Sequence, residues 1–161
     1  MSDGAEALPP RLYGTEAAIR RIAAGLLDRT LPRADWTHEA HLAAVSVLLL
    51  EHREIDLPRE LPAIIAAYNE AVGGRNSDTE GYHETITQYW IAAARAFHAA
   101  NPAGSLVERV NRFITSPEGR RDAPLRHFSR DRLFSVEAQR LLVEPDRMRF
   151  EWTNAAPAVI D

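Results

Sequence analysis

Apolar residues recur at helical spacing along most of the chain, and this pattern constrains the fold more than any other feature. Between Thr15 and Leu31, for example, they follow the i, i+3, i+4, i+7 spacing that gathers side chains on one face of a helix. No segment has the period-two alternation of a half-buried strand, and no internal repeat suggests a solenoid. The sequence therefore predicts an all-α fold.

Capping residues, prolines and glycines divide the pattern into five to six helices. The predicted helices cover approximately residues 15–31, 35–53, 58–73, 77–100, 105–115 and 135–142. Because their connections are short, we expect neighbours to run antiparallel in one single-domain helical bundle. Residues 13–146 would form this bundle, with a flexible arm at 1–12 and an extended tail at 147–161.

Charge and cysteine content exclude several classes of protein. The net charge is −4, from 19 basic and 23 acidic residues that are scattered along the chain, so neither nucleic acid nor an anionic membrane is an expected partner. The absence of cysteine excludes disulfides and thiolate chemistry. The longest apolar run, Leu42–Leu50, is well short of the ~20 residues that span a bilayer. We expect a cytoplasmic protein with a small-molecule substrate, and a homodimer is compatible with the sequence.

Three histidines lie where the pattern expects apolar residues. His38 and His41 continue the stripe of the second helix, and residues three apart on a helix have Cβ atoms roughly 5–6 Å apart. His83 continues the stripe of the fourth helix. If these two faces pack together, the three imidazoles can bind one divalent transition metal. Such ligands suit zinc, iron, nickel or copper, and zinc is favoured.

A second interpretation needs no metal. A histidine on an apolar face is often a core residue, and each buried ring brings two nitrogens that need partners. The three histidines would then form a core polar network. A zincin site is disfavoured because Leu42 stands where H-E-x-x-H requires its second histidine.

Further residues fit a metal-dependent enzyme. Glu84 is the preferred acid–base catalyst and Glu80 the reserve, although either carboxylate could instead be a ligand or support an imidazole. The candidate substrate-binding residues are Tyr82, Thr85, Trp90, Tyr68, Arg130 and Arg132. The arginines suit a carboxylate or phosphate, but they equally suit a solvated turn, and the aromatics equally suit a core.

The remaining histidines are weaker candidates. His52 is predicted to face solvent at a helix end, His98 to follow the apolar stripe of its helix without joining it, and His127 to lie in an Arg-rich stretch. The leading hypothesis is therefore a metal-dependent hydrolase, isomerase or transferase. The alternatives are a non-catalytic module that binds a small ligand or a partner, and a purely structural helical protein.

Four segments resemble a family of small bacterial proteins of unknown function. They are Trp36–Leu42, Tyr82–Thr87, Phe128–Ser135 and Val143–Asp146, and the resemblance covers about residues 31–146. It implies that the segments act together and makes His127 a poor site candidate, but it implies no reaction. The chain is more loosely similar to DinB-like bundles, which hold a divalent ion with three histidines and include thiol-dependent transferases and isomerases. Their histidine spacing differs, so that likeness is architectural.

Overall fold

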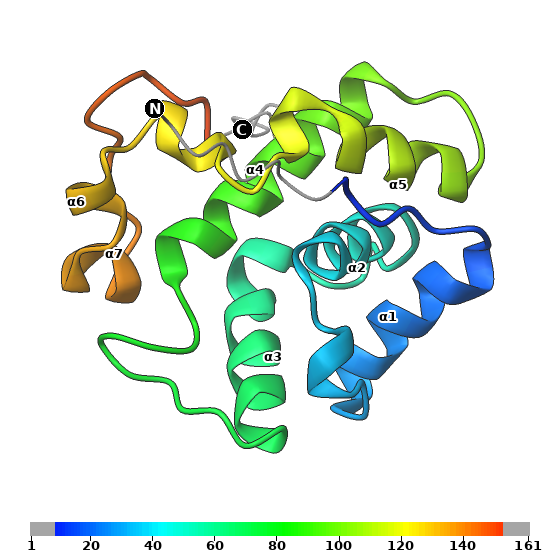
Figure 1. Ribbon diagram of the computed structural model, residues 1–161, viewed down its shortest axis with the longest axis horizontal. Helices are drawn as coiled ribbons and strands as arrows, with labels where there is room; N and C mark the ends of the chain where they lie inside the picture. The colour runs from blue at the N-terminus through cyan, green and yellow to red at the C-terminus, as the bar shows by residue number, and fades with distance from the viewer. Residues whose placement is uncertain (1–8, 153–161) are drawn as a thin grey trace, which may run out of the picture.

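Helices account for all the regular secondary structure in the computed structural model, which describes residues 9–152 (Figure 1). This confirms the predicted all-α, single-domain fold. The α-helices are α1 (Glu16–Asp28), α2 (His38–Glu51), α3 (Leu57–Ala71), α4 (Glu84–Ala100), α5 (Leu106–Thr115), α6 (Arg130–Leu133) and α7 (Val136–Arg140). Three 3-10 turns are η1 (Arg33–Asp35), η2 (Pro117–Gly119) and η3 (Ala123–Arg126).

Helix α2 lies at the centre of the molecule. Figure 1 views it nearly along its axis, with α1, α4 and α5 packed around it. From Leu42 to Leu50 all its side chains except Ser46 are apolar, so apolar residues lie on every side of the helix, and a helix of that kind is stable only when neighbours surround it. The buried residues are Ala40, Leu42, Ala43, Ala44, Val45, Ser46, Val47 and Leu48. The sequence predicted a single buried stripe here, whereas burial extends around the helix.

Hydroxyl caps set several helix starts. Thr15 accepts from the backbone N–H of Ala18 and begins α1, as predicted. The predicted cap of the second helix, Asp35, is instead part of η1. Thr37 takes the capping role and accepts from the backbone N–H of Ala40, so α2 starts at His38.

The fourth helix begins later than the sequence suggested. The backbone N–H of Ser77 donates to the carbonyl of Glu80 at 2.9 Å, which closes a turn. Gly81 follows with a φ of +81°, in the left-handed region that interrupts a helix. Residues 77–82 therefore form a loop, and His83 becomes the N-cap of α4 rather than a residue inside it.

The C-terminal elements cover one end of α4. Helices α6 and α7 lie beside its start in Figure 1, and Phe150 and Trp152 pack against the core. The predicted sixth helix is the shorter α7, and α6 was not predicted. The predicted arm 1–12 and tail 147–161 lie partly outside the described residues.

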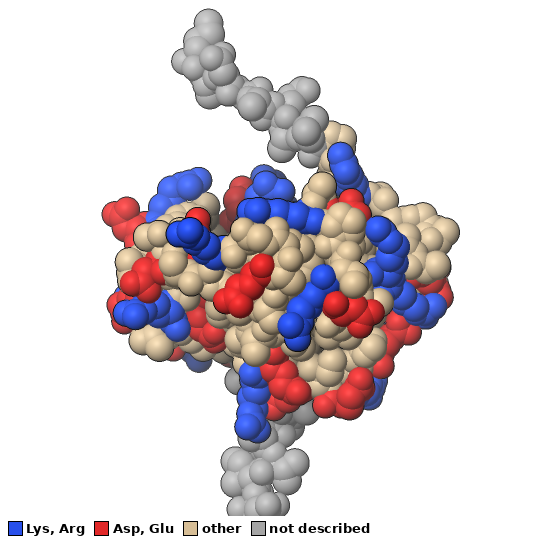
Figure 2. All heavy atoms as spheres, turned by 90° about the horizontal axis from the view of Figure 1, so that it is seen from below, with Lys and Arg blue, Asp and Glu red and all other residues tan. Residues whose placement is uncertain are grey.

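The surface carries mixed charge. Figure 2 shows acidic and basic side chains interspersed over one face, as the scattered charges of the sequence suggest. No helix within residues 9–152 has the length and hydropathy needed to cross a membrane.

Truncation of a side chain in α2 tests the central position of this helix. Leu42 is fully buried, so we predict that Leu42→Ala lowers the free energy of unfolding by about 2–5 kcal/mol in urea titrations. Leu141 is 61% exposed, and Leu141→Ala should change it by less than about 0.5 kcal/mol. Equal losses for the two variants would contradict this packing.

Candidate functional site

His38 and His41 lie in the first turn of α2, and each ring makes one hydrogen bond. Nε2 of His38 donates to the carbonyl of Gly119 at 2.8 Å, and Nδ1 of His41 donates to the carbonyl of Thr37 at 2.6 Å. Because a carbonyl can only accept, these bonds fix both tautomers. The second ring nitrogen of each histidine has no hydrogen-bond partner among residues 9–152, and neither atom is fully buried.

The surroundings keep both imidazoles neutral. Burial lowers the pKa of His38, and it lowers the pKa of His41 to about 4, with a smaller contribution from Arg121 in each case. The His41 ring packs on Trp36 with a centroid separation of 3.8 Å, and the His38 ring lies 5.2 Å from that of Trp90. Neutral imidazole is the form that binds metals, but the positive charge of the nearby Arg121 disfavours the binding of a divalent metal ion.

His83 uses both of its ring nitrogens elsewhere. Nδ1 accepts from the backbone N–H of Ile86 at 3.1 Å and caps α4, while Nε2 donates to the carbonyl of Leu133 at 2.8 Å. The structure thus brings His38 and His41 together and gives His83 a separate role at the start of α4. In the part of the chain that the structure describes, no three His, Asp or Glu side chains are grouped to hold an ion. The three-histidine metal site stays a prediction.

The two predicted catalytic carboxylates occupy different environments. Glu84 accepts from the hydroxyl of Tyr82 through one oxygen and from Nε2 of Gln88, at 2.9 Å, through the other. Burial and this carboxylate raise the pKa of Tyr82. Gln88 Nε2 also donates to the carbonyl of Pro58, so Glu84 belongs to a link between α4 and α3. Glu80 is exposed in the loop before α4.

The predicted substrate-binding residues of the core are engaged with the scaffold. The hydroxyl of Thr85 donates to the carbonyl of Leu141 at 2.7 Å and accepts from the backbone N–H of Val143 at 3.3 Å. Tyr68 is fully buried and donates to the carbonyl of Leu31 at 2.8 Å. Trp90 is only 8% exposed. These side chains hold elements together and leave little surface for a substrate.

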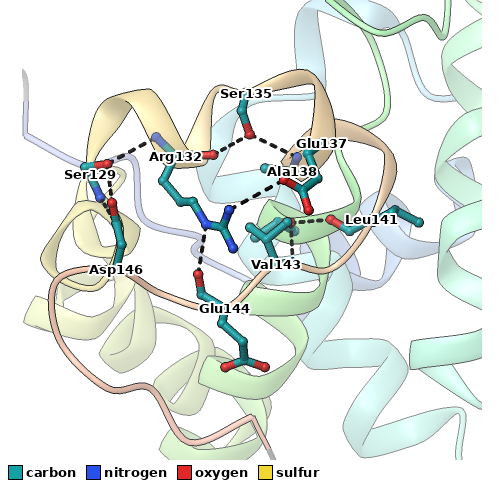
Figure 3. Close-up of polar contacts among 10 residues, drawn as sticks. Ser129, Arg132, Ser135, Glu137, Ala138, Leu141, Val143, Glu144 and Asp146 are labelled. Atoms are coloured by element: carbon teal, nitrogen blue, oxygen red, sulfur yellow. Dashed lines mark hydrogen bonds and ion pairs between the residues drawn. The ribbon is translucent and has the colours of Figure 1, made fainter.

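Hydrogen bonds and an ion pair connect the C-terminal motifs (Figure 3). Asp146 accepts from the backbone N–H of Ser129 at 2.7 Å and from its hydroxyl at 2.6 Å. Nε of Arg132 donates to the carbonyl of Glu144, and its guanidinium lies 3.5 Å from Glu137. Arg130 is exposed at the start of α6. The segments 128–135 and 143–146 are therefore joined to each other.

A cavity of about 560 Å³ opens at the other end of the bundle, between the C-terminal halves of α2 and α4, the start of α3, and α5. None of the predicted site residues lines it. The lining residues are Leu48, Leu49, Leu50, His52, Arg53, Ile55, Leu57, Arg95, His98, Ala99 and Arg109. We call this the arginine cavity.

Two residues that line the cavity each have a buried nitrogen without a partner in the described part of the chain. His98 is 3% exposed; its Nε2 lies 2.8 Å from the hydroxyl of Ser46, and its Nδ1 is buried without a hydrogen bond. Nη2 of Arg109 donates to the carbonyl of His98 at 3.1 Å, while Nε of Arg109 is buried and unpartnered. Leaving such groups unsatisfied costs about 1–3 kcal/mol each. Because each atom has less than 1 Å² of exposed surface, a ligand in the cavity would satisfy it only after the side chain moved towards the cavity.

The cavity is also electropositive. Arg53, Arg95 and Arg109 line it, and no Asp or Glu does. None of these three guanidinium groups forms an ion pair with an acidic residue of the described chain. Burial, and then the charges of Arg109 and Arg112, lower the pKa of His98 to about 4, so His98 is neutral at pH 7.

His98 does not join the predicted apolar stripe of its helix, but it is buried on a second face that the sequence pattern did not reveal. Ile91, Ala94 and His98 are spaced i, i+3 and i+7 on α4 and are all buried, one position around from the stripe that contains Trp90. Ser46, the one polar residue in the apolar run of α2, was the available signal for a buried polar partner. His52 is the half-buried C-cap of α2 rather than a freely solvated residue.

Comparisons with known proteins give no match to any family model, curated protein or solved structure.

The pKa of His98 predicts a loss of stability in acid. The unfolded chain binds a proton to this histidine near pH 6.5, whereas the folded chain does so only near pH 4, so folding becomes less favourable as the pH falls between these values. Urea titrations at pH 7.5, 6 and 5 should show that the free energy of unfolding falls with pH. The fall should be smaller in His98→Asn. An identical pH dependence in the variant would contradict the assignment to His98.

Proposed function

We propose that the protein is a non-catalytic helical module that binds a small molecule in the arginine cavity. The observation that carries this proposal is that two residues lining the cavity, His98 and Arg109, each have a buried nitrogen without a partner, Nδ1 of His98 and Nε of Arg109. Buried polar groups in folded proteins almost always have partners, and exceptions call for a physical explanation. A bound ligand supplies one, because it brings the missing acceptor or donor.

The size and lining of the cavity support the same proposal. Sites for small molecules commonly measure about 300–1,000 Å³ and combine apolar walls with a few fixed polar groups. The arginine cavity lies within this range and has Leu48, Leu49, Ile55 and Leu57 among its apolar lining. By contrast, the histidines of the sequence motifs are hydrogen-bonded into the scaffold, which favours the core-network interpretation for them.

Blocking the cavity tests this function. Ala99 lines the arginine cavity and is exposed, so we predict that Ala99→Trp fills part of it with little loss of stability. Octanol, octylamine and octanoate are titrated into labelled protein, and backbone amide shifts are followed by NMR. At least one compound should bind saturably near Leu48, Ile55 and His98, and Ala99→Trp should weaken that binding at least about 10-fold.

The neighbouring residue provides the control. Ala100 is also exposed but lines a separate cavity, of about 420 Å³, beside Phe97 and Phe150. Ala100→Trp should leave the binding unchanged. If none of the three compounds binds saturably, or if only Ala100→Trp reduces binding, the proposed function is refuted.

A metal-dependent enzyme is the second candidate. The observation in its favour is the pair of neutral rings, His38 and His41, each with one ring nitrogen free of hydrogen bonds. A divalent ion held there, zinc by preference, would lower the pKa of bound water or polarise a substrate oxygen. Glu84 would be the acid–base group only after release from Tyr82 and Gln88, and Glu80 is the reserve.

Metal analysis tests this second candidate. Protein purified without a histidine tag is equilibrated with zinc and dialysed; the metal enzyme predicts about one equivalent, which His41→Ala should lose and His52→Ala should retain. Retention of zinc by His41→Ala, or a zinc-free wild-type protein, refutes the two-histidine site and leaves the arginine cavity unaffected.

A further inference from the structure

We propose that the ligand of the arginine cavity is a monocarboxylic acid with an apolar chain, and that its carboxylate binds Arg109 and His98. This inference depends on the proposed function and adds the chemical class of the ligand. It follows from the number of free donors, from the charge of the lining, and from the apolar surface beside them.

Arg109 offers the first donor. Its Nη2 already donates to the carbonyl of His98, but its Nε–H is buried and has no acceptor. A carboxylate oxygen is the acceptor that guanidinium N–H groups bind most strongly, because both partners are charged and the geometries match. Arg112, on the same helix, donates instead to the carbonyls of Asn101 and Ala103 and does not line the cavity.

His98 offers the second donor. When the hydroxyl of Ser46 donates to Nε2 of His98, the ring proton is on Nδ1, which is the buried atom without a partner. Both atoms have less than 1 Å² exposed, so the two side chains must move slightly to admit a ligand oxygen; a carboxylate that then accepted from this Nδ1–H would satisfy both unpartnered atoms together. Since the ring remains neutral, the inner part of the site supplies one positive charge, from Arg109. One charge matches a monoanion better than a dianionic phosphate.

The rest of the lining selects against other head groups. Arg53 is exposed and Arg95 is half-buried, so they attract anions from solution while water screens them. No acidic residue lines the cavity, so an ammonium group would meet only positive charge. The apolar side chains at the end of α2 and the start of α3, among them Ile55 and Leu57, offer a surface for a hydrocarbon chain.

Compounds that share an octyl chain but differ in head group test the inference. Dissociation constants are measured by calorimetry for octanoate, octanol, octylamine and octyl phosphate with the full-length protein. We expect octanoate to bind at least about 10-fold more tightly than octanol, with octylamine weakest. If octanol or octyl phosphate binds as tightly as octanoate, the carboxylate assignment is wrong while the small-ligand function stands; if nothing binds, that function fails too.

Two arginine variants locate the carboxylate. Arg109→Gln should weaken the binding of octanoate at least about 10-fold and leave the binding of octanol nearly unchanged. The control Arg112→Gln should change the affinity for neither compound. Arg95→Gln should weaken the binding of octanoate by only about twofold. Unchanged octanoate binding by a folded Arg109→Gln refutes the inference. Should Arg109→Gln not fold, the octanoate-to-octanol ratio of the wild-type protein still decides whether a carboxylate is preferred.

Discussion

The need to bury α2 on every side organises this molecule. Seven consecutive residues, from Leu42 to Leu48, are buried, so no face of the helix is available to solvent along that stretch. Helices α1, α4 and α5 contact it directly, and α3 packs against α1 and α4. Transfer of apolar surface out of water contributes about 25 cal/mol per Å², which makes an exposed α2 strongly unfavourable. The other helices are therefore arranged around a single central element.

Polar side chains then fix the segments that hydrophobic packing alone would leave free. His38 binds the carbonyl of Gly119, and His83 binds that of Leu133, so each joins a helix start to a residue distant in sequence. Thr85 similarly joins α4 to residues 141–143. A hydrogen bond of this kind contributes only about 0.5–1.5 kcal/mol, but an orphaned buried group costs more, so these bonds specify the position of the C-terminal elements.

The arginine cavity departs from that rule. Within residues 9–152 three buried side-chain nitrogens have no partner: Nδ1 of His98, Nε of Arg109 and Nε1 of Trp152. The first two belong to residues that line this cavity, which combines apolar side chains with three arginines and has no acidic residue in its lining. We therefore propose that the functional site is this cavity, which lies at the opposite end of the bundle from the sequence motifs.

The sequence by itself determined the all-α fold, the approximate positions of the five long helices and the cap at Thr15, because periodicity and capping are local properties. It also singled out His38, His41 and His83 as unusual polar residues on apolar faces. Only the tertiary structure decided their partners, placed His83 at a helix start through the left-handed Gly81, and brought His98 of α4 together with Ser46 of α2 and Arg109 of α5. The physical reason is that helical spacing defines which residues share a face, while the identity of the facing residue depends on packing between segments 11 to 52 positions apart.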